Sequence, residues 1–300
     1  MIALKVLILC VTFVYIYWKL NFDSKISMSQ FFQSLQDREP AYLLLFTGMA
    51  AINWSFEIVK WKLVISRIRQ LSFLAAARQS LMALTVSLAT PNRIGDYGAK
   101  AYFYDKSLRK QVLLLNLFSN LVQMLITVLF GIFGIAYVVI NFGIELSISH
   151  TIILITILVV MALTGYFFKE KELFIKGLSI AAVWNYFKSL TSSVVWKVSL
   201  FSLFKYLVFS TLFLLMLHFF QRGISIFEVY PLIFAMYLMV SVVPTLFILD
   251  VVVRGGVAVY LFSLVGIGEW PILATVTGMW LLNFVLPALW GGYYLITYKK

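Results

Sequence analysis

The chain has 300 residues, of which 62% are hydrophobic and 12% are charged, against about 25% charged residues in a typical soluble domain. This composition excludes a soluble catalytic domain and indicates an integral membrane protein. One cysteine and two histidines exclude a disulfide framework and argue against a metal or a redox cofactor, and the net charge of +12 is expected mainly to attract anionic lipid headgroups.

About six apolar segments have the roughly 20 residues that a helix needs to cross the hydrocarbon core. The first, residues 1–18, is interpreted as a transmembrane helix, because no small-residue cleavage pattern of a signal peptide follows it. We therefore expect an all-α polytopic membrane protein with a single integral membrane domain over residues 1–300. The remaining full spans begin near Ala41, Val112, Thr151, Leu200 and Ile272.

Basic residues mark one side of the membrane, because cytoplasmic loops accumulate lysine and arginine. They are concentrated between residues 60 and 78, between 100 and 110 and between 169 and 197, and two lysines end the chain. Six crossings then place both termini in the cytoplasm. The lysine-rich loops, with no transit peptide before them, are typical of a bacterial or archaeal plasma membrane.

The apolar segment between Arg78 and Lys100 is flanked by basic residues on both sides. If both flanks are cytoplasmic, the segment enters the bilayer and returns as a re-entrant hairpin over residues 79–104, with a turn near the midplane. Pro91 removes a backbone donor at that turn and Gly95 permits unusual torsion angles. Because freed amides inside a bilayer must be satisfied by protein or by water, the turn predicts a cavity.

A second interrupted apolar segment, residues 229–267, contains Pro244 and the glycine pair Gly255 and Gly256. Its flanks are not basic, which predicts a re-entrant hairpin that enters from the outer side. This hairpin has the opposite orientation to the first one.

The two hairpins predict an inverted repeat, an architecture of transporters whose binding sites lie at the midplane. The first repeat covers residues 40–140 and the inverted second repeat covers 200–297. Between them, residues 176–197 mix aromatic and polar side chains, which is typical of a helix along the inner interface.

Each hairpin contains one arginine and one aspartate: Arg93 with Asp96, and Arg254 with Asp250. Each charge at a helix centre costs about 2.5 to 3.5 kcal/mol, so the four must be paired or hydrated. Spacings of three and four residues place each pair on one helical face. Two interpretations stay open: the pairs pin the hairpin tips together, or the arginines bind an anionic headgroup, since a guanidinium can hold two phosphate oxygens.

Other polar residues receive more ordinary interpretations. Asn116, Asn120 and Gln123 form a stripe that is predicted to face the protein interior. Glu57, with Lys60 one turn on, is expected to form an interfacial ion pair rather than a proton relay.

Two further pairs are assigned to helix packing. Asn53 and Asn283 are each expected to bond to a neighbouring helix, with a cavity role as the alternative. Gly131 and Gly134 are expected to let two helices approach closely.

The sequence resembles the transmembrane region of lysylphosphatidylglycerol synthases, also called the flippase domain, which has many stand-alone members. The resemblance rests on Trp61-Lys62, on the segment from Thr90 to Asp96, and on Pro244 followed by Val253-Arg254, and it spans nearly the whole chain. It implies inverted repeats with re-entrant hairpins and translocation of a phospholipid or an isoprenoid-linked lipid. The positions to which it points are Pro91, Arg93, Gly95, Asp96, Pro244 and Arg254.

The sequence departs from the family pattern in two ways. The acid that often follows the second arginine is replaced by Gly255, with Asp250 one turn earlier as a substitute. The soluble aminoacyl-transfer domain of the two-part enzymes does not occur in these 300 residues, so we expect a stand-alone member that does not synthesise lysyl lipid.

These observations predict a lipid flippase or transporter that binds an anionic headgroup at Arg93, Asp96, Asp250 and Arg254 and rocks one repeat against the other. The alternative is a membrane-embedded transferase, or a subunit of one, which needs a carboxylate free to act as a base. We expect no catalytic residue, no cofactor and no nucleic acid. The expected partners are membrane lipids, with a second copy of the chain or a lipid-synthesis protein left open.

Overall fold

The computed structural model describes residues 40–88, 90, 93–143, 166, 169–172, 179–243 and 247–298, and within the last range the side chains from Val252 onward. This part of the chain is helical apart from an isolated β-bridge between Glu172 and Ser179, which confirms the all-α fold class for it. The predicted helix over residues 1–18 and the one from Thr151 lie outside the described residues, as do Pro91, Pro244 and the side chain of Asp250.

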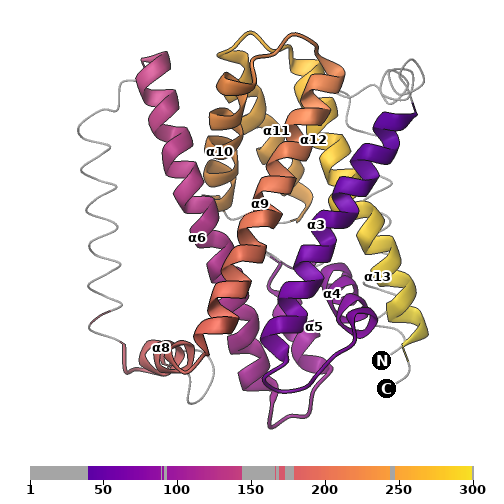
Figure 1. The fold of residues 1–300 in the computed structure, drawn as a ribbon, viewed down its shortest axis with the longest axis vertical. Coiled ribbons are helices and arrows are strands. Elements are labelled where there is room, and N and C mark those ends of the chain that lie inside the picture. The colour runs from indigo at the N-terminus through magenta and orange to yellow at the C-terminus, as the bar shows by residue number, and fades with distance from the viewer. Residues whose placement is uncertain are drawn as a thin grey trace.

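Four stretches of the described chain are long and apolar enough to cross a membrane. They run side by side along the long axis of the molecule (Figure 1). The last of the four contains a π-helical turn between two α-helical segments. The stretches are α3 (Ala41–Ile65), α6 (Arg109–Phe142), α9 (Ser192–Phe220) and the run formed by α12 (Glu269–Trp280), η2 (Leu281–Val285) and α13 (Leu286–Thr297).

Two pairs of shorter helices lie at opposite ends of the molecule, one in the lower and one in the upper half of Figure 1. The lower pair is α4 (Phe73–Leu88) and α5 (Gly95–Tyr102), which pack against each other. The upper pair is α10 (Ile226–Val242) and α11 (Phe247–Ser263), which also pack together. The pairs occupy the two segments for which the sequence predicts hairpins, although α4 begins six residues before the predicted boundary at 79.

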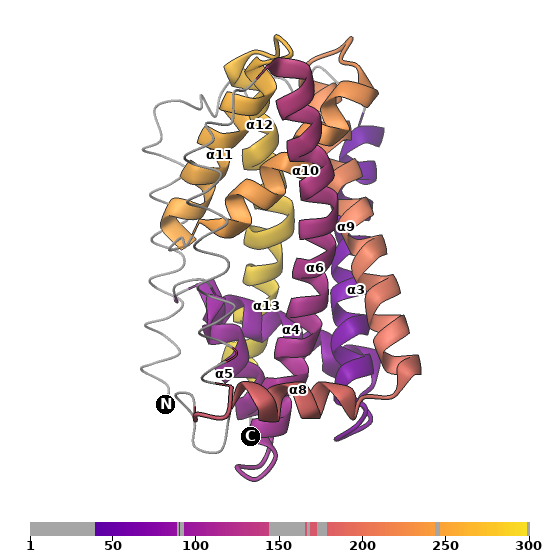
Figure 2. The ribbon, with the colours of Figure 1, turned by 90° about the vertical axis from the view of Figure 1, so that its left-hand side faces the viewer.

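Each short pair is held by a long helix from the other half of the chain: α10 packs along α6, and α4 packs along α13 (Figure 2). Glycines permit both approaches. A Cβ atom at Gly134 would overlap the carbonyl oxygen of Pro231 in α10, and one at Gly291 would overlap that of Leu81 in α4. The packing role predicted for Gly131 and Gly134 is therefore confirmed.

A short helix, α8 (Ile180–Lys188), lies across the lower end of the long helices in Figure 1. It begins at Ser179, whose hydroxyl accepts a hydrogen bond from the Ala182 amide at 3.1 Å and so caps the helix. The predicted helix over 176–197 is thus divided, because the chain turns after Lys188 and α9 starts at Ser192. The position of α8 at a membrane interface stays a prediction.

Candidate functional site

A cavity of about 650 Å³ lies between the two short pairs, with walls from the long helices. Ser87 and Arg93, on either side of the turn between α4 and α5, line it together with Val243 at the end of α10. Helix-breaking segments from both halves therefore border one internal space. Its aromatic lining includes Trp54, Tyr206, Phe209, Tyr237 and Phe284.

Arg93 has an unusual backbone, with φ of 56°, in the left-handed region that residues other than glycine rarely adopt. Such a conformation costs about 1–3 kcal/mol and persists where the surrounding structure or the function requires it. The guanidinium carbon lies 4.2 Å from the centre of the Phe284 ring, a cation–π contact at the cavity wall. The strained turn thus holds the Arg93 side chain in the cavity.

Gly95 is needed at this turn because of a close approach. A Cβ atom there would lie 2.9 Å from the hydroxyl oxygen of Thr90, which accepts a hydrogen bond from the Gly95 amide at 2.8 Å. The sequence predicts that Gly95 supplies the unusual torsion angles of the turn. In the described chain it is Arg93, two residues earlier, that has the left-handed conformation.

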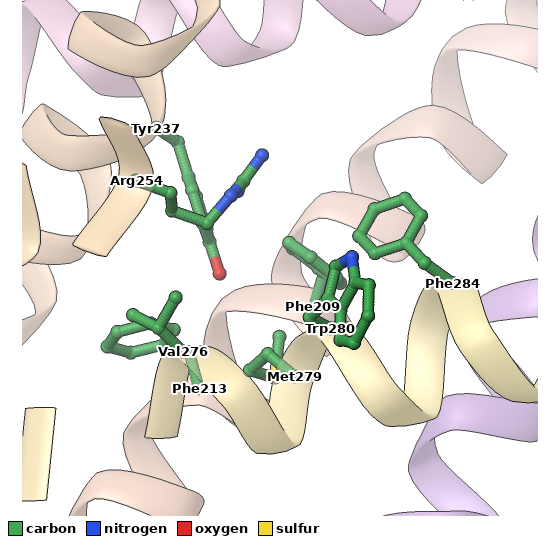
Figure 3. Close-up of a pocket in the computed structure, with 8 residues that line it drawn as sticks. All are labelled: Phe209, Phe213, Tyr237, Arg254, Val276, Met279, Trp280 and Phe284. Carbon is green, nitrogen blue, oxygen red and sulfur yellow. The ribbon is translucent and has the colours of Figure 1, made fainter. Parts of the chain in front are cut away.

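Arg254 enters the cavity from α11, where its guanidinium carbon lies 6.0 Å from the centre of the Tyr237 ring. It also borders a small aromatic recess of about 10 Å³, whose far wall includes Trp280 and Phe284. Figure 3 shows the guanidinium reaching from α11 toward the side on which Phe284 lies. The two arginines singled out in the sequence therefore line the same cavity and share Phe284 as a neighbour.

Asp96 lies in a closed polar triangle with Lys100 and Asn116. The Lys100 ammonium is 3.1 Å from an Asp96 carboxylate oxygen, and it donates to the side-chain oxygen of Asn116 at 3.0 Å. The Asn116 amide in turn donates to Asp96 at 2.7 Å. The predicted placement of Arg93 and Asp96 on one helical face is wrong, because Arg93 precedes α5 and has a left-handed backbone. Lys100 was not predicted as a partner of Asp96, although it lies four residues on and therefore on the same face of α5.

A second layer of contacts fixes Lys100, which is 3% exposed. Its ammonium lies 4.8 Å from the centre of the Trp61 ring, and the Trp61 indole donates to the Gln79 side chain at 2.8 Å. The Tyr104 hydroxyl donates to the same Gln79 oxygen at 3.0 Å.

A second charged group surrounds Glu57 on α3. The Lys205 ammonium lies 2.6 Å from a Glu57 carboxylate oxygen and that of Lys60 lies 3.5 Å from the same oxygen. Lys60 also donates to the Gln123 side chain at 3.0 Å. The predicted pairing of Glu57 with Lys60 is confirmed, but the pair lies at the cavity inside the protein and not at an interface. Lys205 was missed, although a lysine inside the apolar helix α9 is a signal that could have found it.

The predicted polar stripe on α6 does face the interior. Asn116 is buried, whereas Asn120 and Gln123 line the cavity. The Asn120 amide donates to the Tyr97 hydroxyl at 3.0 Å, which ties α6 to α5.

The pair Asn53 and Asn283 joins α3 to η2, as predicted, and also lines the cavity. The Asn53 amide donates to the Asn283 side chain at 2.9 Å, and the Trp54 indole donates to the Asn283 backbone carbonyl at 3.1 Å. A π-helical turn leaves a carbonyl without its usual partner, and π-helical turns are frequent at functional sites. Trp54 and Asn53 together stabilise the turn that places Phe284 beside Arg93.

The charges that line the cavity do not balance. Among the side chains that the structure describes, four are cationic and two are acidic, an excess of two positive charges. A cavity with this balance in an apolar protein favours an anionic occupant. The charged lining residues are Arg93, Lys100, Lys205, Arg254, Glu57 and Asp96.

Long apolar helices around a charged internal cavity define a multi-pass helical membrane protein. The family model described as the lysylphosphatidylglycerol synthase TM region matches residues 2–291. The chain therefore belongs to this family, which confirms the resemblance seen in the sequence and indicates a function related to membrane lipids. Comparison with curated proteins finds no match, and comparison with solved structures finds none either.

Proposed function

We propose that the protein moves a phospholipid or isoprenoid-linked lipid with an anionic headgroup between the leaflets, and that the headgroup binds at Arg93 and Arg254. The observation that carries this proposal is that two arginines, one from each short pair, line one cavity with an excess of positive charge. A guanidinium suits a phosphate because its planar fork can donate to two oxygens at once.

The proposal includes a topology in which the two short pairs are re-entrant hairpins of an inverted repeat. α4 has 16 residues and α10 has 17 residues. At helical rise these lengths reach about 24 to 26 Å, less than the roughly 30 Å of the hydrocarbon core. The pairs also lie at opposite ends of the molecule (Figure 1). In this arrangement α8 lies at the cytoplasmic interface of a bacterial or archaeal plasma membrane, and both termini are cytoplasmic.

In the proposed mechanism the headgroup passes through the cavity while the acyl chains stay in the bilayer. Asp96 and Asp250 reduce the positive charge of the empty site. α4 and α10 are each packed tightly on a long helix of the other half, so whole repeats cannot rock without breaking those contacts. α5 is tied to α6 by the hydrogen bonds of Asp96 with Asn116 and of Tyr97 with Asn120, so we assign the opening of the site to α11.

The proposed protein is a transporter rather than a transferase. A transferase would need a carboxylate that is free to act as a base. The two carboxylates described in the cavity are each bound by a lysine, Glu57 by Lys205 at 2.6 Å and Asp96 by Lys100 at 3.1 Å. Such pairing favours a structural role for both acids.

Reconstitution into phosphatidylcholine vesicles tests the function. The vesicles contain a trace of phosphatidylglycerol with a fluorescent acyl chain, and dithionite added outside quenches the outer leaflet. We expect the wild-type protein to bring the protected inner lipid to the quencher. Arg93→Gln or Arg254→Gln should slow this step at least tenfold, the size of one lost hydrogen bond between charged groups.

The matched control is Arg222→Gln, which removes the same charge from an exposed loop outside the cavity and should leave the rate unchanged. Equal rates for all three variants, with protein that is folded and reconstituted, would overturn the proposed function. A covalently altered lipid in the same vesicles would favour the transferase.

A further inference from the structure

A second cationic cluster is formed by Lys60, Lys100 and Lys205. Lys205 and Lys100 line the cavity, and Lys60 is buried behind it with 1% exposure. All three lie within electrostatic range of Glu57. The lysines come from α3, α5 and α9, so the fold brings them together from three separate parts of the sequence.

The lysine cluster is not neutral. Three lysines share two carboxylates, Glu57 and Asp96, which leaves one positive charge in excess among the described groups. Lys205 is the accessible member, with 24% of its side chain exposed. Glu57 uses one of its three donor positions, so the ammonium can still donate toward the cavity.

The lysine cluster and the arginines are connected through α3 and η2. Asn53 of α3 bonds to Asn283, next to Phe284, whose ring contacts the Arg93 guanidinium. Glu57, which binds Lys205, follows Asn53 by one turn of α3, about 6 Å along its axis. Both cationic groups line one cavity, so a single headgroup can contact both if its negative charges extend from one to the other.

Two buried polar residues also line the cavity, Asn53 of α3 and Ser80 of α4. In the described part of the chain, the Asn53 side-chain oxygen and the Ser80 hydroxyl form no hydrogen bond, and neither atom is accessible to solvent. The cavity lining on these two helices is therefore polar as well as charged.

We propose that Lys205, supported by Lys100, forms a second anion subsite, and that the transported lipid has a phosphate monoester or diphosphate headgroup with two or more negative charges. This inference rests on the proposed transport function and names its substrate class. The arginines bind one end of the charged headgroup and the lysines bind the other. A phosphodiester, which has one negative charge, satisfies only the arginines.

The experiment compares two acyl-labelled lipids in the phosphatidylcholine vesicles: phosphatidate, a phosphate monoester, and phosphatidylglycerol, a phosphodiester. We expect the wild-type protein to move phosphatidate faster. Lys205→Gln should slow phosphatidate about tenfold, the effect of one lost hydrogen bond between charged groups, and slow phosphatidylglycerol less, because a single negative charge does not need the second subsite. Lys197→Gln, on the same helix but exposed and outside the cavity, is the matched control.

A double variant separates anion binding from the ion pair. Lys205→Gln leaves Glu57 without its closest partner, whereas Glu57→Gln with Lys205→Gln removes the pair with no change in net charge. If Lys205 binds the headgroup, the double variant stays slow with phosphatidate. If Lys205 only neutralises Glu57, the double variant recovers the wild-type rate and the proposal is wrong.

The remaining outcomes are also distinguishable. No movement of either lipid by the wild-type protein would refute the transport function itself, whereas equal movement of both lipids would refute only the second subsite. Geranylgeranyl phosphate and geranylgeranyl diphosphate, added as competitors, distinguish a phosphate monoester headgroup from a diphosphate headgroup. Stronger competition by the diphosphate identifies a diphosphate lipid, and equal competition identifies a monoester.

Discussion

The two short helix pairs occupy corresponding places at opposite ends of the molecule, but they differ in their polar contacts. The lower pair buries polar as well as apolar side chains, and the Thr85 hydroxyl of α4 donates to the Ala288 carbonyl of α13 at 2.9 Å. The buried side chains of α10 are almost all apolar, with Leu232 and Phe234 among them. Both pairs meet a long helix at a glycine, so apolar packing holds both, and the lower pair adds hydrogen bonds and charges.

This difference shows that similar placement does not imply similar chemistry. Among the described residues, the lower pair contributes Arg93, Asp96 and Lys100 to the cavity, whereas Arg254 is the charged lining residue of the upper pair. The charged path therefore extends from the cavity toward α5. We infer that the lower pair contributes most of the charge that a headgroup meets, and that the upper pair contributes Arg254 beside the aromatic ring of Tyr237.

The largest expected effect tests whether the two short pairs enter the membrane from opposite sides. In a Cys10→Ser background, which removes the single native cysteine, a cysteine replaces Ser107 beyond α5 or Ser225 before α10. Both positions are exposed, and the helix pairs that they adjoin lie at opposite ends of the molecule (Figure 1). We expect an impermeant maleimide added outside intact cells to label the cysteine at 225 and not the one at 107.

Permeabilised cells are the control for this labelling, because both cysteines should then react. Labelling of both positions from outside intact cells would make the lower pair a true crossing. The predicted inverted repeat would then be wrong, although the residues that line the cavity would be unaffected.

The next largest effect concerns the charges of the lower pair. Lys100→Met should lower the free energy of unfolding by about 3 kcal/mol, the low end of the range for a buried pair, because the half-buried Asp96 carboxylate loses its ion-pair partner. Thermal unfolding in detergent measures this. Asp96→Asn with Lys100→Met should recover most of the loss.

The matched change in the upper pair is Leu232→Met, at a fully buried position in α10. It conserves volume and should cost less than about 1.5 kcal/mol. Equal losses for the lysine and leucine variants would mean that the two pairs are held alike, contrary to the comparison drawn here.

Much of the fold was predictable because apolar length and proline position are local signals. α3, α6, α9 and the run Glu269–Thr297 match predicted spans, and the short pairs match the two interrupted segments. The start of α9 was misplaced by eight residues, because Val194 and Val198 extend an apolar face that packs against Leu190 and its neighbours. The cross-packing of the halves depends on contacts between distant residues and has no local signal.

The site was predictable where a charge interrupts an apolar run, as at Arg93 and Arg254. The sequence gives no distance between helices, so the joining of Lys205 to Glu57 across 148 residues was out of reach. Lys100 was missed for another reason. It stands in a basic cluster that predicts a cytoplasmic loop, and its burial against Trp61 is a tertiary feature.

The smallest expected effect tests the strained turn of the lower pair. Arg93→Gly and Arg93→Ala both remove the side chain and should both abolish movement of the anionic lipid. They differ in backbone freedom, because alanine at a positive φ costs about 1–2 kcal/mol that glycine avoids. We therefore expect the glycine variant to be more stable than the alanine variant by about 1 kcal/mol in thermal unfolding.

The same comparison at Arg254, which lies in the regular helix α11, should have the opposite sign, since glycine inside a helix is about 1 kcal/mol less favourable than alanine. A shared sign at the two arginines would show that the turn at Arg93 is not left-handed, and that strain does not distinguish one pair from the other.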